Sequence, residues 1–276
     1  MSSGPNTPAP GAPRHSLPVM LSIAGSDCSA GAGLQADLKA GLALGCYPLT
    51  AVTCVVSEVP GKVEGLCPLE PDFVAGQVRL CLREYPVRAI KTGMLYSPAI
   101  VAAVAAELRQ QSAPLVIDPV MIATAGEPLM LREAISSYEQ ELIPQATLLT
   151  PNLDELSRLL GTPEPQSPDE LADAALALAR RYRCAILAKG GHLPGRQCCD
   201  ILAEPDGSLH HWEHPRCEAV TTHGTGCTLS AAVAAGLAAG APLRDAVERA
   251  LLYTGRAIAQ SWQLGQHDAL NHRPEL

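Results

Sequence analysis

The chain has 276 residues, of which 47% are hydrophobic and 17% charged, a composition typical of a folded α/β protein and not of a disordered chain. Its formal net charge is -8 at pH 7 and no run of Lys and Arg occurs, which excludes a nucleic-acid partner because phosphate backbones bind basic surfaces. We therefore expect a small-molecule ligand.

The chain opens with a segment that predicts no regular structure. Residues Met1 to His15 are rich in Pro, Gly and Ser and lack the positive start and continuous apolar block of a secretory signal. We predict a disordered tail over residues 1–17. The ten cysteines are expected to be reduced, as is typical of a cytoplasmic protein with a large core.

Short β-branched or apolar runs then alternate with helical patterns. This alternation predicts a three-layer α/β fold, in which a mostly parallel sheet carries helices on both faces and binds ligands at the carboxyl ends of its strands. The predicted strands are Val19–Ala24, Leu49–Val56, Arg88–Lys91, Leu115–Asp118, Thr147–Thr150 and Cys184–Lys189. The predicted helices are Leu34–Leu44, Pro71–Glu84, Pro98–Gln110, Leu129–Leu142, Leu153–Leu160 and Pro168–Arg181, the last capped by Ser167 with Glu170 returning the hydrogen bond.

A hairpin and two helices complete the pattern. Pro205-Asp206-Gly207 is a turn signal between two short strands. The apolar stretch Leu229 to Leu243 falls short of the roughly 20 residues that a membrane span needs, so we predict a buried helix and no membrane partner. We expect a single domain over residues 18–264 and a polar tail over residues 265–276. The predicted elements are strands Cys198–Ala203 and Leu209–Glu213, then helices Cys227–Ala239 and Leu243–Gln260.

Small residues gather directly after the first predicted strand, from Gly25 to Asp37. They let the backbone approach a ligand, and a position between a strand and a helix favours such a role. Gly31-Ala32-Gly33 lacks the spacing of a dinucleotide-binding fingerprint, so a plain tight turn explains this tripeptide equally well.

A second glycine-rich segment, Thr222 to Thr228, leads directly into the apolar helix. Backbone N–H groups at a helix N-terminus form a concave anion site, and glycines let the loop turn those groups inward. We expect a phosphate group to bind there. The alternative is a glycine-rich helix start without a ligand.

Several short motifs occur in a fixed order along the chain. They are Leu21–Asp27 with Gly31–Asp37, Lys91–Leu95, Asp118–Met121, Thr150–Glu155, Lys189–His192 and Thr222–Ser230. In this order they resemble the motifs of hydroxymethylpyrimidine and phosphomethylpyrimidine kinases, over roughly Pro18 to Gln260. The resemblance implies a ribokinase-like fold that binds ATP and Mg²⁺ near the carboxyl edge of the sheet.

The resemblance further implies that Asp118, Asn152 and Glu155 hold the metal ion or its waters. Read alone, Asn152-Leu153-Asp154-Glu155 is also an ordinary helix cap, and an Asp before Pro is commonly a turn residue.

Phosphate and substrate contacts are implied at other positions. We expect Lys189, Thr222 and His223 to contact the ATP phosphates. The alternative for Lys189 is a solvated lysine. The alternative for His223, and for His192, is a loop histidine that only forms hydrogen bonds. The substrate is expected to contact Gly25, Asp27, Ala32, Glu58 and Met94.

The resemblance implies that the catalytic residues are Gly224, Thr225, Gly226 and Cys227. Cys227 stands where many sugar kinases of this fold have an Asp base, and a helix N-terminus lowers a thiol pKa. We expect its thiolate to accept the proton when the alcohol is phosphorylated. The monophosphate needs no strong base, because its second pKa of about 6 leaves the attacking oxygen ionised. A buried, inert cysteine is the alternative.

Glu58 departs from the resembled pattern, which by spacing after Gly45-Cys46-Tyr47 usually has a Gln that pairs with the aminopyrimidine edge. An ionised Glu accepts hydrogen bonds but does not donate them. Glu58 can accept from the amino group or pair with a protonated ring nitrogen. We expect the monophosphate to be preferred over the alcohol, which comparable turnover of both would contradict. Cys28 stands where Pro is usual, a change that we expect to be minor.

The sequence thus predicts ATP-dependent phosphorylation of 4-amino-5-hydroxymethyl-2-methylpyrimidine phosphate, with the alcohol as a second substrate, in thiamin biosynthesis. A homodimer is a fold-level expectation. The alternatives are a pyridoxal kinase of the same fold and a catalytically silent ligand-binding relative. A metal site at His210, His211, His214 and Cys217 fits no standard zinc spacing, and an exposed hairpin is the simpler interpretation.

Overall fold

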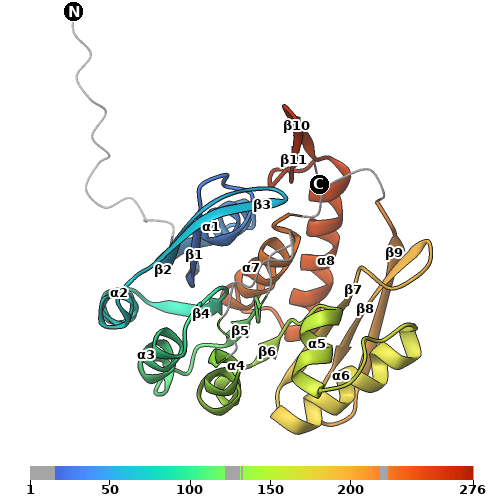
Figure 1. Cartoon of the computed structure of the whole chain (residues 1–276), viewed down its shortest axis with the longest axis horizontal. Helices are drawn as coiled ribbons and strands as arrows, with labels where there is room; N and C mark the ends of the chain where they lie inside the picture. Colours follow the sequence, from blue (N-terminus) through green and yellow to red (C-terminus); the bar gives the residue numbers. More distant parts are fainter. Residues whose placement is uncertain (1–15, 122–130, 132, 218–222, 276) are drawn as a thin grey trace, which may run out of the picture.

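The computed structural model describes residues 16–121, 131, 133–217 and 223–275. Within them nine strands form a sheet of order β3-β2-β1-β4-β5-β6-β7-β8-β9 (Figure 1). The pairs from β2 through β7 are parallel, whereas β3, β8 and β9 pair antiparallel with their neighbours. The strands are β1 Val19–Asp27, β2 Tyr47–Val59, β3 Lys62–Pro68, β4 Val87–Thr92, β5 Leu115–Ile117, β6 Leu148–Leu149, β7 Ala185–Gly190, β8 Gln197–Ala203 and β9 Leu209–Pro215.

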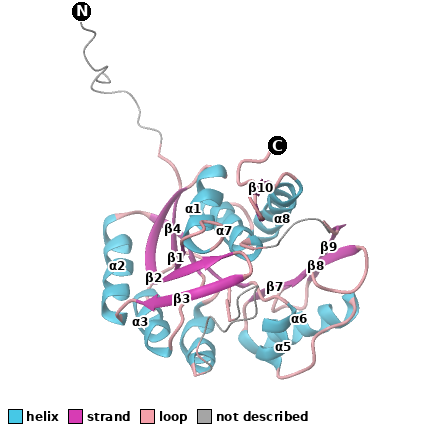
Figure 2. Ribbon diagram, turned by 45° about the horizontal axis from the view of Figure 1, so that its top comes forward, coloured by secondary structure: helices cyan, strands magenta, loops and turns pink. Residues whose placement is uncertain are grey.

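Helices cover both faces of this sheet, so the predicted three-layer arrangement is confirmed (Figures 1 and 2). One face packs against α2, α3, α4, α5 and α6, and the other against α1, α7 and α8. The helices are α1 Gly33–Ala43, α2 Pro71–Glu84, α3 Pro98–Leu108, α4 Ala134–Ser137, α5 Leu153–Leu160, α6 Pro168–Tyr182, α7 Thr225–Ala238 and α8 Leu243–Ala259.

Strand β1 shows why the strands are apolar on both sides. Leu21 and Ile23 belong to the core under the first set of helices, and Met20 belongs to the core under α7 and α8. All three side chains are fully buried. A central parallel strand therefore lacks the polar alternation of a half-exposed strand.

The elements differ from the predicted ones in a few places. The helix predicted to end at Leu142 is α4 followed by a π-helical turn, Tyr138–Leu142, and its predicted start at Leu129 lies outside the described residues. Strand β3 was not predicted. It pairs antiparallel with β2 at the edge of the sheet (Figure 2), and its mostly exposed side chains give it little apolar pattern.

The predicted polar tail over residues 265–276 is not what the structure has. Strand β10, Trp262–Leu264, pairs with β11, His267–Ala269, and the next residues pack against α7 and α8. The His272 ring lies 2.9 Å from Thr228 Oγ1, and Tyr253 donates a hydrogen bond to the His272 carbonyl. Polar residues are buried here because they form hydrogen bonds with these helices.

Helix α7 contains the apolar stretch noted in the sequence as far as Ala238, and most of these side chains are buried, whereas Leu243 begins α8. In the described parts of the chain, no helix combines the length and the apolar character needed to cross a membrane.

Candidate active site

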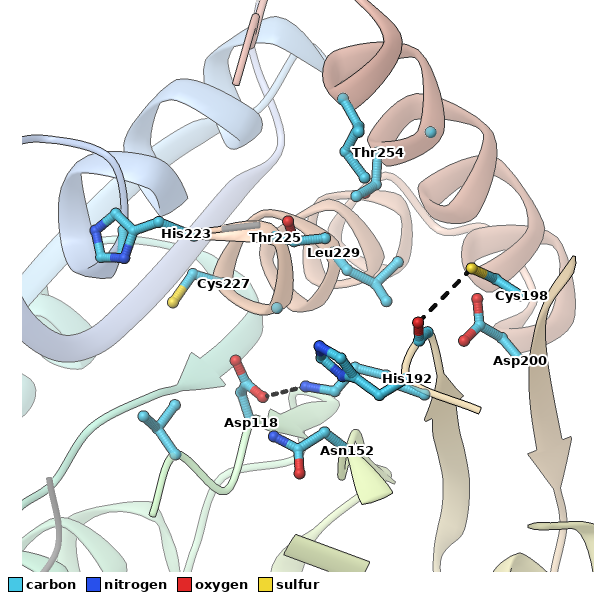
Figure 3. A pocket seen from close by; sticks show the side chains of 18 of the residues that line it. Asp118, Asn152, His192, Cys198, Asp200, His223, Thr225, Cys227, Leu229 and Thr254 are labelled. Atoms are coloured by element: carbon cyan, nitrogen blue, oxygen red, sulfur yellow. Dashed lines mark hydrogen bonds and ion pairs between the residues drawn. The ribbon is translucent and has the colours of Figure 1, made fainter. Parts of the chain in front are cut away.

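A cavity of about 1350 Å³ lies where the central parallel strands end. Figure 3 shows Asp118, Asn152 and His192 on one side of it and Thr225 and Cys227 of α7 on the other. Of the residues predicted from the sequence, Thr222 lies outside the described residues. Asp27 does not line the cavity but contacts Ala32 and His223, which do. The cavity is lined by Gly25, Ala32, Glu58, Met94, Asp118, Asn152, Glu155, Lys189, His223, Gly224, Thr225, Gly226 and Cys227.

The two glycine-rich segments touch each other at this cavity. Gly224 has φ +81°, and a Cβ there would lie 1.9 Å from the carbonyl oxygen of Gly31. A Cβ on Gly31 would lie 2.6 Å from Cδ2 of His223. The lack of a side chain at Gly224 therefore permits this close approach, and a side chain at Gly31 would displace the His223 ring.

Asp27 ties these segments together. Its carboxylate accepts hydrogen bonds from the backbone of Ser29, Gly31 and Ala32 and from the Ser29 hydroxyl, and it lies 3.1 Å from Nε2 of His223. Burial alone would raise the pKa of Asp27, but the hydrogen bonds from His223, Ala32 and Ser29 outweigh it and lower this pKa to about 2. Asp27 is thus a fixed anion that organises the loop.

The start of α7 faces the cavity with hydrogen-bond donors. Gly224 is its N-cap residue, and the first N–H groups of a helix have no acceptor within the helix. Thr225 Oγ1 is buried and has no hydrogen-bond partner among the described residues. A Cβ on Gly226 would lie 3.2 Å from Nζ of Lys189, so a cation stands beside these donors. The arrangement suits an anion such as a phosphate.

A partly buried cation, Lys189, lies beside the start of α7. The Lys189 ammonium is 3.0 Å from Oδ1 of Asp118. Burial opposes the charge on Lys189, but Asp118 and Glu155 raise its pKa. Lys189 is therefore a partly buried, paired cation and not the solvated lysine of the alternative interpretation.

Asn152 and Glu155 form a capping box at the start of α5. Asn152 Oδ1 accepts from the Glu155 N–H, and Glu155 Oε2 accepts from the Asn152 N–H, both at 2.9 Å. Glu155 is buried, and burial followed by Asp118 raises its pKa to about 7 although Lys189 opposes this. The helix-cap interpretation is confirmed, and it leaves room for a second role. Two buried carboxylates, Asp118 and Glu155, line the cavity beside Lys189, a donor set that fits Mg²⁺ held partly through water.

Cys227 does not have the expected thiolate character. Its sulfur accepts a hydrogen bond from the Gly33 backbone and faces the cationic Lys91, which both lower its pKa. Burial is the larger effect and raises the pKa of Cys227 to about 12. Burial thus outweighs the helix N-terminus, which speaks against a ready thiolate in the protein without ligand, and the base role of Cys227 stays a prediction.

The cavity continues into an apolar region between α7 and α8 on one side and β8 and β9 on the other. Leu229, Leu251 and Ile258 line it, together with Trp212 and Thr254 (Figure 3). The sequence did not identify these residues, because leucines and isoleucines at helical spacing have the same pattern as an ordinary core face. An apolar slot beside an anion site is suited to a nucleotide base.

The histidines of β9 do not form a metal site. His210 lies 3.6 Å from Glu204, and His214 lies 3.7 Å from Asp200. Within the described residues His210, His211, His214 and Cys217 do not bring three ligand atoms together.

Comparison with known proteins shows the family of the chain. The model of the phosphomethylpyrimidine kinase family matches residues 27–272. A hydroxymethylpyrimidine/phosphomethylpyrimidine kinase of Streptomyces coelicolor is 42% identical over 90% of this chain and 91% of its own. A relative from Schizosaccharomyces pombe, with the same two activities in its name, is 38% identical over 95% of this chain, which spans about half (51%) of the relative's length. Among solved structures, the ADP complex of Bacillus subtilis pyridoxal kinase matches with a TM-score of 0.85 and 32% identity, covering 94% of this chain and 98% of that one.

Proposed function

The chain belongs to the phosphomethylpyrimidine kinase family, and from this premise we propose that it transfers the γ-phosphoryl group of ATP to 4-amino-5-hydroxymethyl-2-methylpyrimidine phosphate. The product is the pyrimidine diphosphate used in thiamin biosynthesis, and the alcohol is a second substrate. The carboxyl edge of a parallel sheet is where ligands are expected to bind in such a fold, which supports a reaction in the cavity found there.

One observation carries the proposal. A single cavity joins the anion-binding start of α7, the buried carboxylates Asp118 and Glu155, and apolar regions at both ends. Phosphoryl transfer depends mainly on positioning and on stabilising charge. A cavity that holds a base at one end and a small ring at the other aligns both reactants at the α7 N-terminus.

Two carboxylates would hold Mg²⁺ at the centre of the cavity. Asp118 and Glu155 are the residues that fit, with the Asn152 amide next to them. When bound, Mg²⁺ supplies charge neutralisation on the transferring phosphoryl group. Lys189 adds a positive charge at the same place, and its pairing with Asp118 at 3.0 Å keeps it in position.

The start of α7 stabilises the transferring group. We expect the N–H groups at this helix start, together with the Thr225 hydroxyl, which has no partner among the described residues, to stabilise the developing oxygen charge. A phosphate oxygen of the substrate attacks the γ-phosphorus, the bond from that phosphorus to the bridging oxygen breaks, and ADP leaves. Since the attacking oxygen is already ionised near neutral pH, Cys227 positions the group as a neutral thiol and removes no proton.

A coupled assay of ADP release with MgATP tests this proposal. Wild type, Cys227→Ala and Cys81→Ala are compared on the monophosphate, the alcohol and pyridoxal. Cys81 lies on α2 and does not line the cavity, so it is a matched control. We expect turnover of the monophosphate that falls in Cys227→Ala and is unchanged in Cys81→Ala. Turnover of none of the pyrimidines contradicts the proposal.

A pyridoxal kinase is the second candidate. The B. subtilis pyridoxal kinase shares the fold at a TM-score of 0.85, and pyridoxal also presents a small ring with a hydroxymethyl group. The same assay decides between the candidates, because turnover of pyridoxal alone assigns that activity and excludes the pyrimidine substrate.

A further inference from the structure

Glu58 lies near the end of β2, directly after a register shift in its pairing with β3. Its side chain is half-buried and lines the cavity. The Cys28 sulfur accepts a hydrogen bond from the Glu58 N–H at 3.3 Å and donates to the Glu58 carbonyl at 3.2 Å. The two positions at which the sequence departs from the pattern it resembles are thus in direct contact, and the thiol of Cys28 holds Glu58 in place.

The charges around Glu58 favour a bound proton. Polar side-chain atoms of Glu58, Asp27 and His223 lie within 4.8 Å of one another, and Asp27 is a permanent anion because its hydrogen bonds hold its pKa at about 2. Burial first, and then Asp27, raise the pKa of Glu58, while His223 opposes them.

The other ionisable groups that face Glu58 do not offset this effect. Lys62 of β3 lines the same cavity, but its ammonium is 2.6 Å from Glu64. Cys54 of β2 is neutral because burial raises its pKa to about 11. The Cys28 thiol is hydrogen-bonded to the Glu58 backbone. Glu58 is therefore the cavity-lining carboxyl group at this end that is protonated most readily, and once protonated it can donate a hydrogen bond.

Beside Glu58 lies an apolar slot. Val56 and Met94 belong to a small buried cluster, with Val63 and Val120 packed against it, and all four line the cavity. A flat heteroaromatic ring fits such a slot. A 4-aminopyrimidine then presents a ring nitrogen, which accepts, next to an amino group, which donates. An ionised carboxylate can form a hydrogen bond only with the amino group, because both of its oxygens are acceptors.

We propose that Glu58 recognises the aminopyrimidine by sharing one proton with its ring nitrogen, so that the pair forms both hydrogen bonds only when this proton is present. The inference rests on the proposed function. The proton lies between a Glu58 oxygen and the ring nitrogen, and the amino group donates to the other Glu58 oxygen. When both partners are deprotonated before binding, one proton is taken up from water.

Isothermal titration calorimetry with the pyrimidine monophosphate at pH 8 measures this uptake, in two buffers of different ionisation enthalpy. The phosphate contributes little, since its second pKa is about 6. The variants are Glu58→Gln, whose amide both donates and accepts at every pH, and Glu64→Gln as the control on neighbouring β3. We expect the wild type and Glu64→Gln to take up close to one proton and to lose affinity up to tenfold per pH unit above pH 8. Glu58→Gln takes up none and keeps its affinity.

The other outcomes are distinguishable. Equal proton uptake in wild type and Glu58→Gln overturns the inference and leaves the proposed function standing, as does wild-type binding without uptake. Loss of binding in a folded Glu58→Gln also contradicts it, because the amide offers the same donor and acceptor. If no variant binds or phosphorylates the pyrimidine, the proposed function fails and the inference fails with it.

Discussion

The Lys91 ammonium and the Asp37 carboxylate form an ion pair in which both side chains are fully buried, with Nζ 2.8 Å from Oδ2. The Ser22 hydroxyl donates to the same carboxylate. Lys91 also lines the cavity and faces Cys227. Strands β1 and β4 and helix α1 are thereby connected to the start of α7 through one charged group.

Breaking this pair destabilises the protein. Lys91→Met leaves Asp37 buried without a counter-charge, and removing one partner of a buried pair costs about 3–5 kcal/mol. We expect the free energy of unfolding, measured by urea denaturation, to fall by this amount. The control is Lys62→Met, which breaks the exposed pair with Glu64 and leaves stability almost unchanged. Equal losses in the free energy of unfolding for the two variants would show that the buried pair stabilises the protein no more than the exposed pair does.

Gly224→Ala removes activity by steric conflict with the first glycine-rich segment. The new Cβ would lie 1.9 Å from the Gly31 carbonyl oxygen, so the two segments must separate. Gly240→Ala is the matched control, because Gly240 has a similar φ of +88° but open space around its Cβ position. Both variants carry backbone strain of about 1 kcal/mol. Only Gly224→Ala is expected to lose turnover, by more than a hundredfold, and similar activity in both would contradict the close contact.

Glu155→Gln changes the pH dependence of stability. The pKa of Glu155 is raised to about 7 in the folded protein, so the folded state binds more protons than the unfolded state between about pH 4.5 and pH 7. Wild-type stability therefore falls as the pH rises through this window. The amide introduced by the substitution keeps an oxygen that accepts from the Asn152 N–H and carries no charge.

The two proteins are compared by denaturation at pH 5 and pH 8. We expect equal stability at pH 5 and a gain on the order of 1 to 3 kcal/mol for Glu155→Gln at pH 8, with turnover reduced at least tenfold. A constant difference across this range would contradict an ionisation at Glu155.

Cys227 reacts slowly with alkylating reagents. Burial raises its pKa to about 12, and the thiolate is the reactive form. With iodoacetamide at pH 8, peptide mass spectrometry should show Cys227 modified at least tenfold more slowly than exposed Cys67. Modification at the same rate would restore Cys227 as a candidate base.

Local sequence signals predicted most of the elements. Helix α6 illustrates this, because Ser167 accepts from the Glu170 N–H at 3.2 Å, as its capping pattern indicates. The return bond differs in detail, since Glu170 accepts from the Gln166 N–H and not from Ser167. The glycine-rich loops and the strand-end side chains were also found, because in a parallel sheet these positions meet at one edge.

Features formed by partners far apart in the chain were not predicted. Asp37 and Lys91 are 54 positions apart, and no local pattern names the partner of a buried charge. The C-terminal residues were predicted as a polar tail because the hydrogen bonds that bury His272 come from α7 and α8, far away in the sequence. The raised pKa of Cys227 depends on burial, which its position at a helix start does not show.

The contact between His223 and Asp27 joins residues 196 positions apart, and this separation bears on how the protein is synthesised. When a ribosome has translated as far as Pro215, all nine strands of the described sheet exist, but α7 and α8 have not been made. The part of the sheet face with Val116, Leu148 and Leu187 then lacks the cover of these two helices, whereas Met20 already lies beside Gly41 of α1. An open apolar face on a nascent chain binds chaperones or aggregates. The contact between His223 and Asp27 and the protection of this sheet face thus form together, after Pro215 has been translated.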